Sequence, residues 1–76
     1  MTETKIKLNT FVDVQAFVNV IMTFGFDIDL VSGRYIVDAK SIMGIYSLDL
    51  SNPIVLRAHT EDAEDLFSAI DKYIVK

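Results

Sequence analysis

The side chains that could support covalent chemistry in this chain are one histidine and a few hydroxyls. His59 is the side chain suited to act as a nucleophile or a base near neutral pH. Because no serine has an evident histidine partner and cysteine is absent, the usual pairing of an activated nucleophile with a base is missing. The serines concerned are Ser41, Ser47, Ser51 and Ser68.

Glycines and carboxylates suggest no further catalytic site. The three glycines are too dispersed to form a phosphate-binding loop. Asp27 and Asp29 alternate along an extended segment, but no third ligand has the loop spacing of a cation site. We therefore expect no metal, no cofactor and no independent enzyme.

The segment from Lys40 to Leu48 is the most informative stretch. Ser41 can cap a short helix, because its side-chain oxygen can accept a hydrogen bond from a free N–H in the first turn. The apolar residues that follow are Ile42, Met43, Ile45, Tyr46 and Leu48, interrupted by Gly44. One face of so short a helix cannot bury them all. Either some form an exposed docking surface beside the cap, or all five are core.

Composition indicates one small domain over residues 1–76. Apolar residues make up 51% of the chain, which argues against disorder. The net charge of −4, without a basic stripe, makes a nucleic-acid partner unfavourable. No apolar run is long enough to insert in a membrane, and Met1 to Lys5 do not resemble a signal peptide. We expect a cytoplasmic protein.

Periodicity predicts the elements of the first half. Thr4, Ile6 and Leu8 alternate with polar residues, which indicates a strand. Thr10 and Asp13 form a variant capping box at the start of a helix. Its buried stripe would be Val14, Phe17, Val18, Ile21 and Phe24, with Gly25 as the stop.

A hairpin should follow that helix. Phe26, Ile28 and Leu30 alternate with aspartates, and a strand from Arg34 to Ala39 returns after a Ser32–Gly33 turn. This turn would pair Leu30 with Tyr35, Ile28 with Val37 and Phe26 with Ala39. All six would share one sheet face, with Asp27 and Asp29 on the opposite, solvated face.

The second half adds one strand and one helix. Ile54, Leu56 and Ala58 alternate as a buried strand face, and Thr60 is expected to cap the last helix. The acidic first turn would be Glu61, Asp62, Glu64 and Asp65, and the apolar stripe Ala63, Leu66, Phe67, Ile70 and Ile74. The order β-α-β-β-α-β-α predicts an α+β fold of two layers, with helices on one face of an antiparallel sheet.

The run Lys-Ser-Ile-Met-Gly-Ile-Tyr-Ser-Leu, residues 40–48, resembles Lys-Ser-Ile-Met-Gly-Val-Met-Ser-Leu around the regulatory serine of HPr. HPr is the histidine-containing phosphocarrier of the bacterial sugar phosphotransferase system. Element order extends the resemblance over nearly the whole chain. It implies an open-faced sandwich with strand order 1-4-2-3 and three helices on one face.

The family's phosphocarrier motif resembles Gly-Leu-His-Ala-Arg-Pro and is not retained. Counted without gaps from Ser41, the histidine position falls on Thr10, the arginine position on Val12 and the proline position on Asp13. The resemblance therefore implies a degenerate active site. His59 could be a relocated phosphoryl acceptor, since it follows Arg57 and precedes a helix start, but the four carboxylates that follow would repel phosphate.

The resemblance also implies that Ser41 is a regulatory phosphorylation site or its relic, with Lys40 as a nearby cation. The expected partner-binding residues are Thr10, Lys40, Ser41, Ile42, Met43 and Tyr46. Partners would be phosphotransferase-system proteins, a serine kinase or a regulator. The leading hypothesis is an HPr-like protein that acts by binding. The alternatives are an active carrier using His59 and a structural or oligomerising domain unrelated to sugar transport.

Overall fold

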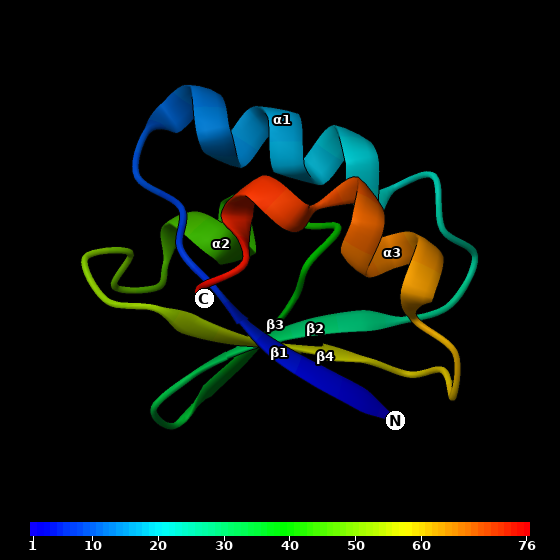
Figure 1. The fold of residues 1–76 in the computed structure, drawn as a ribbon. Coiled ribbons are helices and arrows are strands. Elements are labelled where there is room, and N and C mark those ends of the chain that lie inside the picture. The colour runs from blue at the N-terminus through cyan, green and yellow to red at the C-terminus, as the bar shows by residue number, and fades with distance from the viewer.

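A computed structural model describes residues 1–76 as one sheet covered by helices (Figure 1). The elements in chain order are β1 (Thr2–Ile6), α1 (Phe11–Ile21), β2 (Ile28–Ser32), β3 (Tyr35–Asp38), α2 (Ile42–Tyr46), β4 (Ile54–Ala58), α3 (Glu64–Ala69) and a 3-10 turn, η1 (Asp71–Tyr73). All strand pairs are antiparallel, in the order β1-β4-β2-β3. The helices lie on one face of the sheet, as the sequence predicts.

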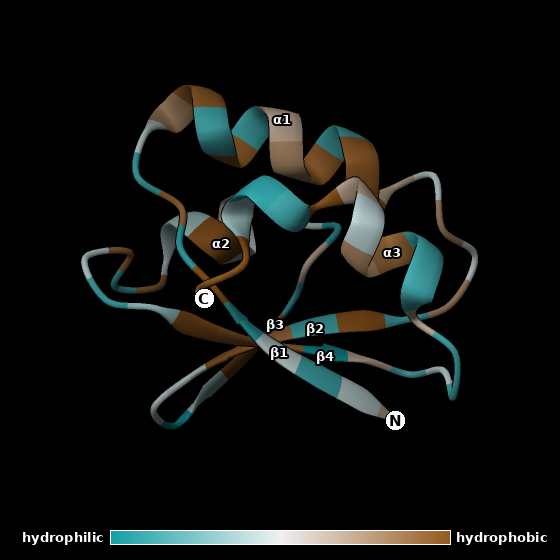
Figure 2. Ribbon diagram, viewed as in Figure 1, coloured by the Kyte–Doolittle hydropathy of each residue, from teal (hydrophilic) through white to brown (hydrophobic).

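The core lies between the helices and one face of the sheet, and all of its 18 buried residues are hydrophobic. In β4 the alternation of Ile54, Leu56 and Ala58 buries each of these side chains, as predicted. Figure 2 shows hydrophobic and hydrophilic bands alternating along α1, whose buried residues recur at three- and four-residue spacing. No helix has the length and apolar composition that crossing a bilayer would need.

The first helix begins where the sequence predicts and ends earlier. Thr10 is the N-cap, and the reciprocal bonds of the capping box with Asp13 are both present. The helix ends at Ile21 with Met22 as its C-cap, and Phe24 lies beyond it, half-buried. Gly25 is not the stop and does not have the positive φ of a glycine cap, so this prediction is wrong.

The hairpin forms with a different register. The turn is Gly33–Arg34, and Leu30 lies opposite Val37 instead of Tyr35. Gly33 has φ +59°, whereas φ is not positive at Arg34. A two-residue turn of this kind requires glycine at its first position, which moves the loop one residue along the chain. The resulting shift of two residues leaves each side chain on its predicted face.

The last helix begins later than predicted. Thr60 is not its cap, because the Thr60 hydroxyl instead accepts a hydrogen bond from the N–H of Asp62. The helix starts at Glu64, after Ala63, which is buried and makes no side-chain capping bond. Residues 59–63 connect the end of β4 to the start of α3.

Candidate functional site

Ser41 caps α2 as predicted. Its backbone is extended (φ −103°, ψ 107°), and its Oγ accepts a hydrogen bond from the N–H of Gly44 at 3.2 Å. A Cβ on residue 44 would lie 3.3 Å from both Ser41 Oγ and Val37 Cβ, so glycine allows the close approach of the cap. The Ser41 side chain is exposed and therefore accessible to a modifying enzyme.

The five apolar residues after Ser41 divide between core and surface. Ile45 and Leu48 are buried, and Ile42 is half-buried against the core. Met43 is 75% exposed and Tyr46 36% exposed. Because residues three apart lie on one side of a helix, Met43 and Tyr46 share the outward face of α2.

The start of α1 extends this surface. The ring of Phe11 stacks on that of Tyr46, with centroids 5.4 Å apart and planes 12° from parallel. Phe11 is nevertheless 60% exposed, and its neighbour Val12 is 69% exposed. We call Phe11, Val12, Met43 and Tyr46 the helix-end patch.

Phe11 is not among the partner-binding residues expected from the sequence. Its spacing from Val14 and Val18 is the same three- and seven-residue interval that marks the buried stripe, so periodicity alone would place it in the core. Its ring instead packs on Tyr46 of α2, outside the core, and stays largely exposed. The exposure of Phe11 therefore depends on three-dimensional packing and could not be predicted from periodicity.

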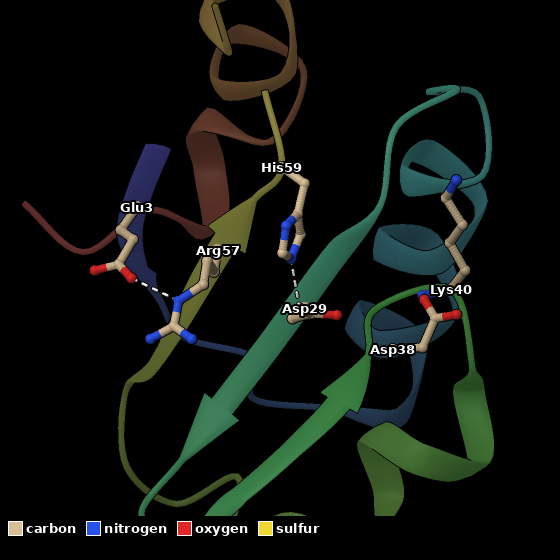
Figure 3. A network of polar contacts seen from close by, with 6 residues as sticks. All are labelled: Glu3, Asp29, Asp38, Lys40, Arg57 and His59. Atoms are coloured by element: carbon tan, nitrogen blue, oxygen red, sulfur yellow. Dashed lines mark hydrogen bonds and ion pairs between the residues drawn. The ribbon is translucent and has the colours of Figure 1, made fainter. Parts of the chain in front are cut away.

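Lys40 does not direct its cation to Ser41. Its Nζ donates to the carbonyl of Phe24 at 2.8 Å, and its backbone N–H donates to Asp38 Oδ1 at 2.8 Å. Figure 3 shows the Lys40 side chain extending away from α2, toward the segment after α1. The expectation of a cation beside the Ser41 hydroxyl is wrong, since the Lys40 ammonium instead links the end of β3 to the segment after α1.

Backbone N–H groups at the start of α1 already donate hydrogen bonds to side-chain oxygens of the same chain. Thr10 Oγ1 accepts from the N–H of Asp13 at 3.1 Å. Asp13 Oδ2 accepts from the N–H groups of Asn9 at 3.1 Å and Thr10 at 3.2 Å. A carboxylate thus occupies the amides that would otherwise attract an anion to a helix N-terminus.

Lys7, the residue after β1, lies beside the start of α1. Lys7 Nζ donates to Asn9 Oδ1 at 3.0 Å and to the carbonyl of Leu50 at 2.9 Å, joining the start of α1 to the loop after α2. In the same loop, the hydroxyl and N–H of Ser51 donate to Asp49 and hold the pKa of that carboxyl below its ordinary value. The sequence did not indicate that Lys7 would lie here.

His59 lies on the open face of the sheet. Its Nε2 is 2.7 Å from Asp29 Oδ2, and neighbouring Arg57 pairs with Glu3 at 2.6 Å (Figure 3). These residues alternate with the buried residues of β1, β2 and β4, so they point away from the helices. His59 and Ser41 therefore do not share a pocket, and the cation of Arg57 is already paired.

The family model "PTS HPr component phosphorylation site" matches residues 13–76, a range that leaves out Thr10 and Val12. The chain belongs to the HPr family. Members of this family are phosphocarriers of the phosphotransferase system rather than enzymes, and they interact with other proteins of that system.

Solved structures agree with this assignment. HPr-C-His from Thermoanaerobacter tengcongensis matches with a TM-score of 0.80 and 30% identity, over 95% of this chain and 89% of that one. The phosphocarrier protein HPr from Bacillus anthracis str. Ames matches with a TM-score of 0.75 and 25% identity, over 97% of this chain and 96% of that one. No curated protein matched in the sequence search.

Proposed function

We propose that this HPr-family chain, folded as a single domain over residues 1–76, does not carry phosphate on histidine and acts by binding protein partners. The observation that carries the proposal is the reciprocal capping box of Thr10 and Asp13 at the start of α1. These two residues stand at the family's histidine and proline positions, and Val12 stands at its arginine position.

Phosphoryl transfer at this helix would lack each of its requirements. A carrier needs an imidazole nitrogen to attack phosphorus and donors to stabilise the phosphoryl oxygens. Here the hydroxyl and the carboxylate accept the local hydrogen bonds, and the carboxylate repels an incoming anion. The arrangement stabilises the helix start and offers no nucleophile of the family's kind.

The binding surface we propose joins the helix-end patch to the cap of α2. Its sequence-predicted members are Thr10, Lys40, Ser41, Ile42, Met43 and Tyr46, and we add Phe11 and Val12 because both are exposed beside them. Exposed apolar side chains on two neighbouring helices are typical of protein docking surfaces. The expected partners are phosphotransferase-system proteins, a serine kinase or a regulator.

We further propose that phosphorylation of Ser41 regulates this surface. The hydroxyl is exposed at a helix N-cap, and a phosphate there would bring about −1.5 to −2 charges next to Met43 and Tyr46. The test is incubation with the cognate kinase and ATP, followed by intact mass and peptide mapping. Phosphate on Ser41 supports the proposal, and an unmodified Ser41 refutes it.

The binding proposal is tested by titrating the chain with purified enzyme I of the phosphotransferase system. Met43→Glu should weaken binding at least tenfold, because a methionine side chain that the partner covers contributes about 1.5–3 kcal/mol and this contribution is lost. Ile36→Glu is the matched control, since Ile36 on β3 is 60% exposed and lies outside the patch. Equal losses in both variants, or no loss in either, would contradict the proposal.

Experiments with the same two proteins distinguish the other two hypotheses. Transfer of phosphate from enzyme I to His59 would support an active carrier. The Asp29 carboxylate beside the His59 ring does not favour this alternative. Absence of any binding, together with self-association in analytical ultracentrifugation, would support a structural or oligomerising domain.

A further inference from the structure

β3 is an edge strand of the sheet, and no other strand pairs with its outer side. The strand order β1-β4-β2-β3 gives it β2 as its single neighbour (Figure 3). β4 and β2 separate it from β1 and from the C-terminal segment, which pairs with β1 at Ile6. Native edge strands are usually protected by lysine, proline, a bulge or a covering element, because an open edge pairs readily with another strand.

The peptide groups of Ile36 point to this outer edge. Residues two apart on a strand direct their N–H and C=O groups to the same side. The N–H of Ala39 donates to the carbonyl of Ile28 at 2.8 Å, so Val37, two residues earlier, faces β2 as well. Ile36 and Asp38 alternate with these residues and face outward. No turn, loop or side-chain hydrogen bond of the chain uses the N–H or C=O of Ile36.

The side chains of β3 leave apolar surface exposed on both faces of the sheet. Ile36 is 60% exposed on the open face, and Tyr35 is 69% exposed on the face that carries the helices. The strand reads Tyr-Ile-Val-Asp, a β-favouring sequence with neither lysine nor proline. This edge therefore lacks the usual protection against pairing with a further strand.

Two unpaired charges stand at the ends of β3. Arg34 precedes the strand and Asp38 is its last residue, and neither forms an ion pair within the chain. Asp38 also lies directly opposite Asp29 of β2, and like charges opposite one another destabilise a sheet. A cation on the outer side of Asp38 would offset this repulsion.

Antiparallel pairing of two copies of β3 brings the unpaired charges together. Such a ladder forms only in registers that place outward-facing residues opposite one another. The register centred on Ile36 sets this residue opposite its own copy, and at each end it sets Arg34 opposite Asp38 of the other copy. Registers centred on Tyr35 or Val37 instead place a charged residue opposite Ile36. Charge complementarity therefore selects the first register and a second copy as the occupant.

We propose that two copies of this chain associate by antiparallel pairing of β3 with β3, about a two-fold axis at Ile36. The N–H and C=O of Ile36 bond reciprocally with those of its copy, and Tyr35 lies opposite Val37 of the second copy. Because the net charge of −4 opposes association and the paired strand is short, we expect a weak dimer that dissociates on dilution. The pairing uses no residue of the helix-end patch, so it stands independently of the function proposed above.

The test is analytical ultracentrifugation of the full chain from about 10 μM to about 1 mM, the range in which weak complexes dissociate. We expect the mean mass to rise toward that of a dimer, with amide shifts at Ile36 and Asp38 in the ¹⁵N-labelled chain. Ile36→Pro should weaken association about tenfold or more, because proline removes an outward N–H that the β2 ladder does not use. Ile36→Val, which keeps this N–H, should associate as the wild type does.

The register is tested with two charge variants at exposed positions. Arg34→Glu and Asp38→Lys each place like charges opposite one another at both ends, so each variant alone should be monomeric. An equimolar mixture of the two restores opposite charges at both ends and should associate again. Lys5→Glu makes the same change in net charge as Arg34→Glu, but on β1, and should associate as the wild type does.

Four results would each overturn the proposal. They are a wild-type chain that stays monomeric over the whole range, association that survives Ile36→Pro, amide shifts confined to α2, and a mixture of the two charge variants that does not associate.

Discussion

Removing either side chain of the capping box should destabilise the fold measurably. Thr10→Ala loses the bond to the N–H of Asp13, and such N-cap losses cost about 1 kcal/mol. Asp13→Ala loses two accepted bonds and a carboxylate at the helix N-terminus, the latter worth about 0.3–1 kcal/mol. Because Thr10 is exposed and Asp13 half-buried, water replaces part of each interaction, and we expect about 0.5–1 kcal/mol per variant.

The assay is urea and thermal unfolding followed by circular dichroism. For a domain of this size, 1 kcal/mol corresponds to a fall in Tm of about 4–8 °C. Thr23→Ala is the control, since this exposed hydroxyl at the other end of α1 only donates to the carbonyl of Val20 and should cost under about 0.5 kcal/mol. If Thr10→Ala and Asp13→Ala cost no more than the control, the amides at the helix start are not engaged, and the reasoning fails.

Three further predictions concern single sites. Ser41→Ala should cost about 0.5–1.5 kcal/mol by unfolding, whereas Ser41→Asp should keep the cap and the stability within about 0.5 kcal/mol. Ser51→Ala should raise the pKa of Asp49, measured by NMR titration. Because folding lowers that pKa, the stabilisation from Asp49 is present at neutral pH and is lost as pH falls through the folded value; an unchanged pKa in the variant would contradict this. His59→Gln should leave partner binding unchanged, since the ring pairs with Asp29 on the open sheet face, away from the helices; a loss like that of Met43→Glu would contradict the assignment.

Sequence reasoning worked where one local rule decides the outcome. The alternation of Ile54, Leu56 and Ala58 predicted β4, because a strand with one covered face must bury every second residue. The residues of the Thr10–Asp13 capping box lie close in the chain, so their types and spacing were sufficient. The strand order 1-4-2-3 came from the HPr resemblance, and the structure confirms it.

Prediction from the sequence failed where two local rules competed or where segments distant in the chain meet. A glycine next to a serine allowed two positions for the hairpin turn, and only the φ of Gly33 decides between them. Thr60 has the right type for a cap, but its hydroxyl is used in a local turn before the helix. The positions of Phe11 on Tyr46, of Lys7 beside Asn9 and of Lys40 on the Phe24 carbonyl depend on tertiary packing.

The most direct test of the central claim is phosphoryl transfer from labelled phosphoenolpyruvate through enzyme I to the intact chain, with an HPr that retains the histidine motif as positive control. Our account predicts that the control acquires acid-labile phosphate and that this chain acquires none. Acid-labile phosphate on this chain, mapped to His59, would contradict it.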